Sequence, residues 1–277
     1  MNDSKTTTAL LTFGGHLEVL RKMLFRIILI VVILGCVILY FKKQTFTILL
    51  APNSSGFYTF RVIETLIQSM GFDFQFADYK IGLISTELSA QFMTHITVSC
   101  ILAVVLASPY ILFELFKFIS PALYEREKKY SYLVAGIIYL LFILGLLMNY
   151  FILFPISFQF LATYQVDEGI VNAITLDSYI STFTTLSFLM GIVFQLPIIV
   201  FVLGKMGFIN VQMLKHYRSY AFIIIMVVAA VITPPDIFTL ILVTIPIYGL
   251  YEISILVLKR STIPIGHSVE DDINDNR

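Results

Sequence analysis

The chain has 277 residues, of which 58% are hydrophobic and 13% are charged, and its mean hydropathy is +0.90. A soluble domain carries about 25% charged residues, so this composition excludes that class and indicates an integral membrane protein. The 18 basic and 18 acidic side chains cancel, and we therefore expect no nucleic-acid partner. Both cysteines, Cys36 and Cys100, lie in apolar runs, which predicts packing and no disulfide framework.

Stretches without Asp, Glu, Lys or Arg predict six transmembrane helices, because a helix needs about 20 apolar residues to cross a bilayer. The predicted fold is an all-α membrane protein, and we expect residues 1–258 to form a single six-span membrane domain. The predicted spans lie at residues 24–41, 88–114, 130–154, 179–203, 218–232 and 237–257. The acidic end, residues 259–277, is typical of a disordered cytoplasmic tail.

The later spans contain interruptions. Pro155 is expected to close the third span, and Gln195 with Pro197 to interrupt the fourth. The last two spans are short and are joined by Thr233-Pro234-Pro235-Asp236, which predicts a tight turn and a helical hairpin. Their apolar stretches, residues 219–232 and 237–251, reach only ~20 Å at ~1.5 Å per residue, so they would thin the bilayer or leave the bundle concave.

The distribution of Lys and Arg predicts the orientation, because short cytoplasmic loops retain positive charge. The loops at residues 155–178 and 233–236 contain no Lys or Arg, whereas the alternate connections and both termini do. Residues 42–87 also carry basic side chains, but long loops are translocated with little regard to charge. We therefore expect both termini in the cytoplasm, and an external loop at 42–87 whose length and aromatic content favour interfacial helices.

Motifs of catalysis are absent from the sequence. Gly204-Lys205 lacks the glycine spacing and the Ser or Thr of a nucleotide-binding loop, and no Gly-x-Ser-x-Gly motif occurs. The four histidines have no metal-ligand spacing. We expect neither enzymatic activity nor a cofactor or metal.

Polar groups at membrane depth are costly unless they are paired, so each is a candidate functional residue. Gln195 lies midway along the fourth span, where its amide either contacts a partner helix or bonds to a neighbouring span of this chain. Pro197 frees a backbone carbonyl there and bends the helix.

Two glutamates lie near the predicted cytoplasmic ends of spans. Glu114 has Lys117 three residues later, a spacing at which helical side chains meet. Glu252 precedes Lys259 and Arg260 by about two turns. Ion pairing with these cations is the simplest interpretation of both carboxylates.

Two cytoplasmic segments combine charge with apolar character. The stretch from Leu10 to Arg21 has apolar residues at helical spacing, as in a helix at the membrane surface, and Glu18 faces Arg21 on it. The loop 118–129 places two carboxylates among three cations. This loop is either a solvated charge run or a place where a carboxylate, weakly screened beside the bilayer, binds a cation on a peptide.

Several motifs together resemble the TatC family, the six-span subunits of the twin-arginine translocase. They occur in the family's order across most of the chain. They are Phe13 with His16-Leu17 and Leu20-Arg21, Phe118-Ile119-Ser120-Pro121-Ala122-Leu123-Tyr124 followed by Glu127, Phe194-Gln195-Leu196-Pro197, Lys215 with Arg218-Ser219-Tyr220, Thr233-Pro234-Pro235-Asp236, and Ile245-Pro246-Ile247-Tyr248 leading to Leu250-Tyr251-Glu252.

The resemblance implies a receptor site for twin-arginine signal peptides. Glu127 would bind the paired arginines, Phe118 and Leu123 would shape the site, and Glu18 and Arg21 would contribute from the first helix. A guanidinium offers a planar fork that a carboxylate meets bidentately, which lysine does not reproduce.

The resemblance also implies partners within the membrane. Gln195, where many relatives carry Glu, would contact single-span TatA/TatB-type subunits, with Pro197 and Glu252 as neighbouring intramembrane candidates. Pro121, like Pro234, Pro235 and Asp236, would shape a turn. The implied protein exports folded precursors across the bacterial cytoplasmic (inner) membrane, using the proton-motive force, and forms homo-oligomers within a larger complex.

One position departs from the family pattern. The family places Glu two residues after the His-Leu pair, where this chain has Val19, and Glu18 stands one position earlier. Either Glu18 takes over the second carboxylate role or it pairs with Arg21 and Lys22. A secondary transporter, an intramembrane enzyme and a scaffold without peptide recognition remain alternatives, although no internal repeat or facing catalytic pair supports the first two.

Overall fold

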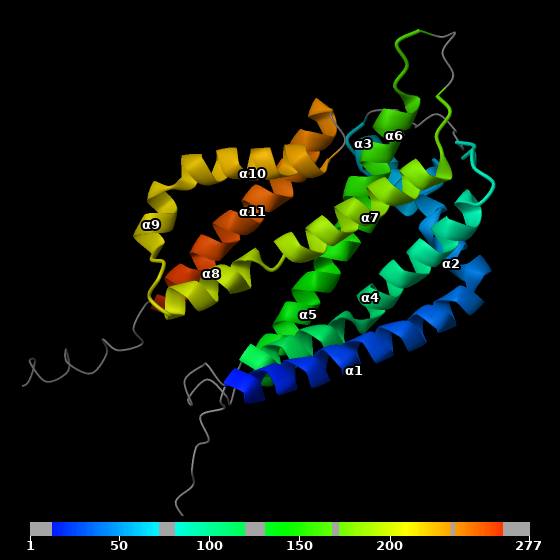
Figure 1. Cartoon of the computed structure of the whole chain (residues 1–277). Coiled ribbons are helices and arrows are strands. Elements are labelled where there is room, and N and C mark those ends of the chain that lie inside the picture. The colour runs from blue at the N-terminus through cyan, green and yellow to red at the C-terminus, as the bar shows by residue number, and fades with distance from the viewer. Residues whose placement is uncertain (1–12, 72–80, 120–130, 168–171, 234–235, 263–277) are drawn as a thin grey trace, which may run out of the picture. The chain divides into compact units, whose positions relative to one another are not determined.

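The computed structural model describes residues 13–71, 81–119, 131–167, 172–233 and 236–262, drawn in colour in Figure 1. Regular structure in these residues is helical, and the only β-type pairing among them is an isolated bridge between Ile84 and Thr175. The all-α prediction is confirmed. The described chain forms two compact units, and each is described by itself.

The predicted spans correspond to apolar helices. Within the described residues, five helical segments are long and apolar enough to cross a membrane, and a sixth apolar helix is shorter. The five are Leu17–Tyr40, Ala90–Glu114, Gly136–Thr163, Leu176–Lys205 and Ile237–Arg260, and the shorter one is Arg218–Val231. The cytoplasmic placement of the termini stays a prediction.

Unit 1 comprises residues 1–48 and 89–139 and is built on two long helices, α1 (Phe13–Tyr40) and α4 (Ala90–Ile119). They pack against each other along much of their length (Figure 1). Gly35 of α1 faces Ala103 of α4, and small residues at such a position let two helix backbones approach closely. The short helix α2 (Lys42–Leu49) follows α1, and its Phe46 ring meets His95 of α4 edge-on.

Unit 2 comprises residues 49–88 and 140–277. Its core contains a cluster of rings in which Phe154 packs edge-on against Tyr179 and Phe183. The buried Tyr179 hydroxyl donates to the Leu49 carbonyl oxygen at 2.9 Å. The remaining helices are η1 (Ala51–Asn53), α3 (Tyr58–Ser69), α6 (Phe154–Thr163), α7 (Leu176–Val193), α8 (Leu196–Lys205), α9 (Val211–His216), α10 (Arg218–Ile232) and α11 (Ile237–Thr262).

The third span does not end at Pro155, so that prediction is wrong. Helix α5 (Ser131–Met148) passes into a π-helical turn at Asn149–Leu153 and then into α6. Pro155 is the second residue of α6. Proline is tolerated in the first turn of a helix, where its missing N–H would have no partner in any case.

The fourth span is interrupted where the sequence predicts. Helix α7 ends at Val193, residues 194–195 form a turn, and α8 begins at Leu196 with Pro197 in its first turn. The same tolerance for proline in a first turn explains why the chain restarts as a helix instead of ending there.

The last two spans differ in length. Helix α10 has 15 residues and α11 has 26, about 22 Å and 39 Å at ~1.5 Å per residue. The sixth span is therefore longer than predicted, because α11 continues to Thr262, five residues past the predicted end at residue 257. Only α10 remains short enough for the bilayer-thinning hypothesis.

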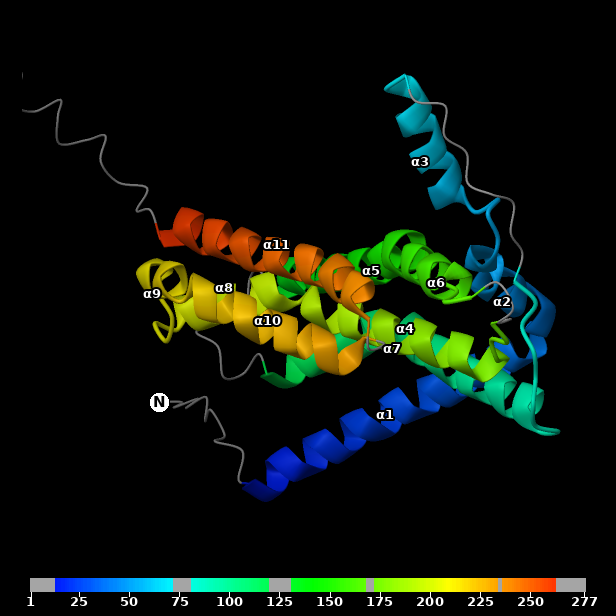
Figure 2. The same ribbon diagram turned by 90° about the horizontal axis from the view of Figure 1, so that it is seen from above.

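The loop at 42–87 does contain helices. After α2 comes α3, whose first turn is fixed to the π-helical segment, because the Thr59 hydroxyl donates to the Phe151 carbonyl oxygen and the Phe57 ring stacks on Phe151. Beyond that turn α3 projects away from the other helices of unit 2 (Figure 2). Its placement at the membrane interface stays a prediction.

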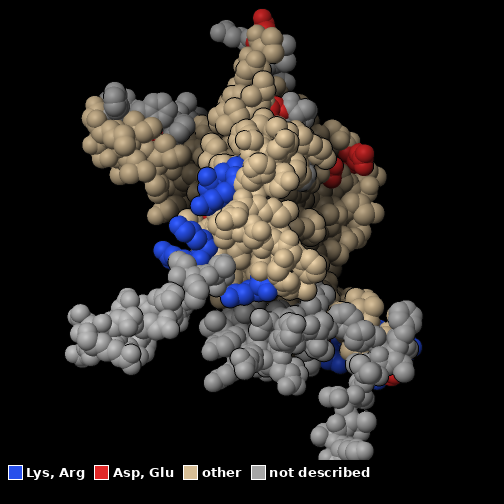
Figure 3. All heavy atoms as spheres, turned by 90° about the vertical axis from the view of Figure 1, so that its left-hand side faces the viewer, with Lys and Arg blue, Asp and Glu red and all other residues tan. Residues whose placement is uncertain are grey.

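One end of unit 2 is basic. The last turns of α8, α9 and α11 carry Lys205, Lys215, and Lys259 with Arg260. The ends of α8 and α11 are adjacent, since a Cβ added to Gly204 would collide with Leu258. Figure 3 shows Lys and Arg side chains gathered on the face that these helix ends occupy. Cations at helix C-termini also interact favourably with the helix dipoles.

Candidate functional site

The predicted site residues fall partly inside and partly outside the described residues. Pro121, Leu123 and Glu127 lie outside them, as do Pro234 and Pro235 of the turn. Phe118 lies in α4, but its side chain is not among those described. The structure therefore tests the geometry of the others: Glu18, Arg21, Gln195, Pro197, Asp236 and Glu252.

Glu18 lies on α1 and forms an ion pair within its own helix. Lys22 Nζ donates to Glu18 Oε1 at 2.7 Å, and both side chains are about 60% exposed. Of the two predicted possibilities for Glu18, pairing with Lys22 is what the structure contains. An exposed pair at this spacing contributes little to stability, because solvent screens the two charges, so a stronger ligand can replace the lysine.

Arg21 lies beside an open cavity of about 520 Å³ at this end of α1. The described residues that line it are Arg21, Lys22, Phe25 and Arg26. The cavity thus combines cations with one exposed aromatic ring.

Glu114 is the most buried of the described carboxylates that form ion pairs, with 9% of its side chain exposed. Arg26 Nη1 of α1 donates to Glu114 Oε1 at 3.2 Å, and the Tyr110 hydroxyl donates to the same oxygen at 3.0 Å. The predicted partner was Lys117, whose side chain is not among those described. The sequence could have revealed Tyr110, which precedes Glu114 by one turn, but not Arg26, which is 88 residues away.

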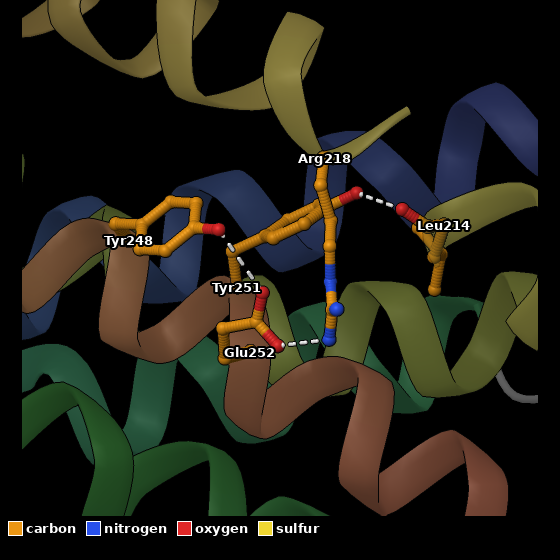
Figure 4. A network of polar contacts seen from close by, with 5 residues as sticks. All are labelled: Leu214, Arg218, Tyr248, Tyr251 and Glu252. Atoms are coloured by element: carbon orange, nitrogen blue, oxygen red, sulfur yellow. Dashed lines mark hydrogen bonds and ion pairs between the residues drawn. The ribbon is translucent and has the colours of Figure 1, made fainter. Parts of the chain in front are cut away.

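A second network of the same composition joins α10 to α11 in unit 2 (Figure 4). Arg218 Nη2 donates to Glu252 Oε2 at 2.6 Å, and the Tyr248 hydroxyl donates to Glu252 Oε1 at 3.1 Å. The prediction that Glu252 pairs with Lys259 or Arg260 is wrong. Those cations lie about two turns, or ~10 Å, further along the same helix, whereas Arg218 reaches across from the neighbouring one.

Tyr251 extends this network to α9, because its hydroxyl donates to the Leu214 carbonyl oxygen at 2.7 Å (Figure 4). The two tyrosine rings on α11, Tyr248 and Tyr251, stack with centroids 6.2 Å apart. Both tyrosines occur in the sequence motif that ends at Glu252, but neither contact was predicted from the sequence.

Gln195 lies at the break between α7 and α8 and is half-buried. Its Nε2 donates to the Gly191 carbonyl oxygen, one turn earlier in the chain, at 3.4 Å. Gly191 itself packs tightly, since a Cβ there would lie 2.6 Å from the Phe142 ring. Pro197 is buried in the first turn of α8. Pro197 thus begins the helix that follows the break, and the Gln195 side chain bonds to the backbone of the helix that precedes it.

Asn149 is a fully buried amide that sequence reasoning missed. It begins the π-helical segment, and its Nδ2 donates to Ser187 Oγ at 2.7 Å and to the Phe183 carbonyl oxygen at 3.4 Å. A lone amide in an apolar span was a signal that could have found it. Its bonds stay within unit 2 and join the third span to the fourth.

Asp236 begins α11 as its N-cap. Its Oδ1 accepts a hydrogen bond from the Thr239 backbone N–H at 2.6 Å, as a capping carboxylate does. This agrees with a turn that separates α10 from α11. Within the described residues, no three His, Cys, Asp or Glu side chains come close enough to hold a metal ion.

Apolar helices of spanning length, linked by partly buried Tyr–Glu–Arg networks, define a polytopic α-helical membrane protein. A family model described as Sec-independent protein translocase protein (TatC) matches residues 15–246. The chain therefore belongs to the TatC family.

Relatives and solved structures support this assignment. The chain is 34% identical over 249 residues to a Blattabacterium TatC, covering 88% of this chain and 94% of the relative. It is 30% identical over 240 residues to the Escherichia coli TatC, covering 87% and 85%. A crystal structure of the twin-arginine translocase receptor TatC superposes with a TM-score of 0.69 at 33% identity, covering 89% of this chain and 99% of that one.

Proposed function

We propose that this protein is the receptor subunit of a twin-arginine translocase, which binds the signal peptides of folded precursors at the cytoplasmic membrane surface. The observation that carries the proposal is the similarity, over nearly the whole chain, to a protein described as the translocase receptor. The loop motif Phe118-Ile119-Ser120-Pro121-Ala122-Leu123-Tyr124 with Glu127 adds local support.

The chemistry of recognition follows from the residue types. Glu127 is an anion that the sequence predicts to lie in a loop at the membrane surface, where a peptide guanidinium would meet it through two parallel hydrogen bonds. Phe118 and Leu123 offer apolar surface to the part of the signal peptide beyond its arginines. Glu18 and Arg21 on α1 would contribute to the same site.

The remaining steps concern topology and partners. The basic end of unit 2 would face the cytoplasm, because cytoplasmic loops retain Lys and Arg. Single-span TatA/TatB-type subunits would assemble against the membrane face near Gln195. Transport would use the proton-motive force of the bacterial inner membrane.

Site-specific photocrosslinking tests the receptor role. A photoreactive amino acid at position 118 or 123 should crosslink to a signal peptide with paired arginines and not to its paired-lysine version. We expect Glu127→Ala to abolish these crosslinks, because it removes the anion that the guanidinium forks require.

Glu125→Ala is the matched control, since it removes a carboxylate two residues away in the same loop. Crosslinks that ignore both the arginines and Glu127 would contradict the proposal. They would favour a scaffold or a secondary transporter instead.

A further inference from the structure

The two Tyr–Glu–Arg networks differ in how the carboxylate oxygens are used. In unit 2, Glu252 accepts from Tyr248 at Oε1 and from Arg218 at Oε2, so both oxygens are engaged. In unit 1, both donors meet Oε1 of Glu114. Among the described residues, no donor bonds to Glu114 Oε2, although a carboxylate can accept about four hydrogen bonds.

The Arg26 contact to Glu114 is also of the weaker kind. Only Nη1 takes part, at 3.2 Å, and 52% of the arginine side chain is exposed while 9% of the glutamate is. A guanidinium that bound both oxygens in parallel would make the stronger, bidentate interaction. Glu114 therefore retains hydrogen-bonding capacity that Arg26, held through one nitrogen, does not use.

Glu114 is close in sequence to the proposed recognition loop. It lies on α4, one helical turn before Phe118 and thirteen residues before Glu127. Two arginines in tandem present two guanidinium groups, and Glu127 accounts for one. The other candidate, Glu18, is exposed and paired with Lys22, so solvent screens it.

We propose that Glu114 is the second carboxylate of the receptor site and binds the guanidinium of one of the two paired arginines. The peptide arginine displaces Arg26, which turns to solvent, and takes both Oε1 and Oε2. The buried carboxylate stays neutralised throughout, because one guanidinium replaces another. Tyr110 continues to donate to Oε1. This inference rests on the proposed function.

Equilibrium binding to the full chain in nanodiscs tests the inference. The probes are fluorescent signal peptides with two arginines, with two lysines, or with citrulline, a neutral isostere, at either arginine position. We expect Glu114→Gln to weaken binding of the paired-arginine peptide about tenfold, since it removes a charge-assisted hydrogen bond. In the unaltered protein, citrulline at either position should lower the affinity of the peptide. In Glu114→Gln, citrulline at the position that Glu114 binds should cause no further loss of affinity.

Arg26→Gln separates recognition from a purely structural ion pair. It removes the competing guanidinium and leaves the carboxylate in place, so the paired-arginine peptide should bind at least as tightly as to the unaltered protein. If the pair only holds α1 against α4, Arg26→Gln should weaken binding as much as Glu114→Gln, which would overturn the inference. Because Arg26→Gln leaves Glu114 intact, it still tests the inference if Glu114→Gln does not fold.

Two further variants, Glu252→Gln and Glu18→Gln, test whether the effect is specific to Glu114. Glu252→Gln alters the equivalent network of unit 2 and should leave peptide binding unchanged. If Glu18→Gln and not Glu114→Gln removes the preference for arginine, Glu18 is the second carboxylate and the inference fails.

The failure of the inference is distinct from that of the proposed function. Binding that prefers arginine and depends on Glu127, but not on Glu114, rejects the inference alone. Equal binding of arginine and lysine peptides, unaffected by Glu127→Ala, rejects the receptor function itself.

Discussion

At the scale of the residue, buried polar groups meet partners that are partly local and partly distant. Tyr110 and Tyr248 each lie one turn before the glutamate they contact, a relation that the sequence displays. The arginines that complete the networks, Arg26 and Arg218, come from other helices. The tyrosine–glutamate contact of each network can therefore be predicted from the sequence, and the arginine–glutamate contact cannot.

Glycine at one helix contact is required by backbone proximity. A Cβ on Gly145 would lie 2.5 Å from the Met190 carbonyl oxygen. We expect Gly145→Ala to destabilise the folded protein by about 1–3 kcal/mol, because backbone, unlike a flexible side chain, cannot move aside cheaply. The thermal unfolding midpoint of the detergent-solubilised protein measures this.

Gly249→Ala provides the matched control. It lies inside α11, and, apart from its chain neighbours and the adjacent backbone of its own helix, no atom lies within 4 Å of a Cβ added there. Its unfolding midpoint should stay the same or rise, because alanine favours a helix over glycine. Equal loss in both variants would show that contact with Met190 is not the cause.

At the scale of the element, prolines occur both where helices restart and inside helices that continue. Pro155 and Pro197 each stand in the first turn of a new helix, α6 and α8. Pro109 and Pro246 lie inside α4 and α11, which continue through them. The sequence gives the same residue in all four places, and the neighbouring backbone decides the outcome.

The start of α11 depends on its cap. We expect Asp236→Ala to cost about 1 kcal/mol of stability, because the Thr239 N–H loses the acceptor that replaces a missing helical bond. Hydrogen exchange should accelerate in the first turn of α11. Asp236→Asn, which retains an acceptor oxygen, should keep exchange slow. Equal protection in all three proteins would mean that the cap does not hold the turn.

At the scale of the whole molecule, charge predicts which side of the membrane each loop faces. The loop after α6 has no Lys or Arg, while the ends of α8, α9 and α11 are basic. In a background with Cys36 and Cys100 replaced by Ser, we expect a membrane-impermeant maleimide to label Gln165→Cys in intact cells. Gln212→Cys should react only after the membrane is permeabilised.

Both glutamines used in this labelling experiment are exposed in the folded protein, so accessibility to reagent reports the side of the membrane. Labelling of Gln212→Cys in intact cells, with Gln165→Cys protected, would invert the proposed topology. The signal-peptide site would then face the wrong compartment for a cytoplasmic receptor.

The sequence by itself determined the class, the approximate spans, the break at Gln195 and the family. Apolar length, proline and charge asymmetry are local or compositional properties, and each span must satisfy its own backbone hydrogen bonds within the bilayer. The helical continuation through Pro155 was missed because a π-helical turn depends on what packs around it.

Only the tertiary structure decided which charges pair. Glu252 meets Arg218 and not the cations on its own helix, and Glu114 meets Arg26 across 88 positions of sequence. Glu18 instead pairs with Lys22, which lies on the same helix. Ion pairs between helices depend on helix packing, which brings together residues that no spacing in the sequence relates, and it is this packing that singles out Glu114.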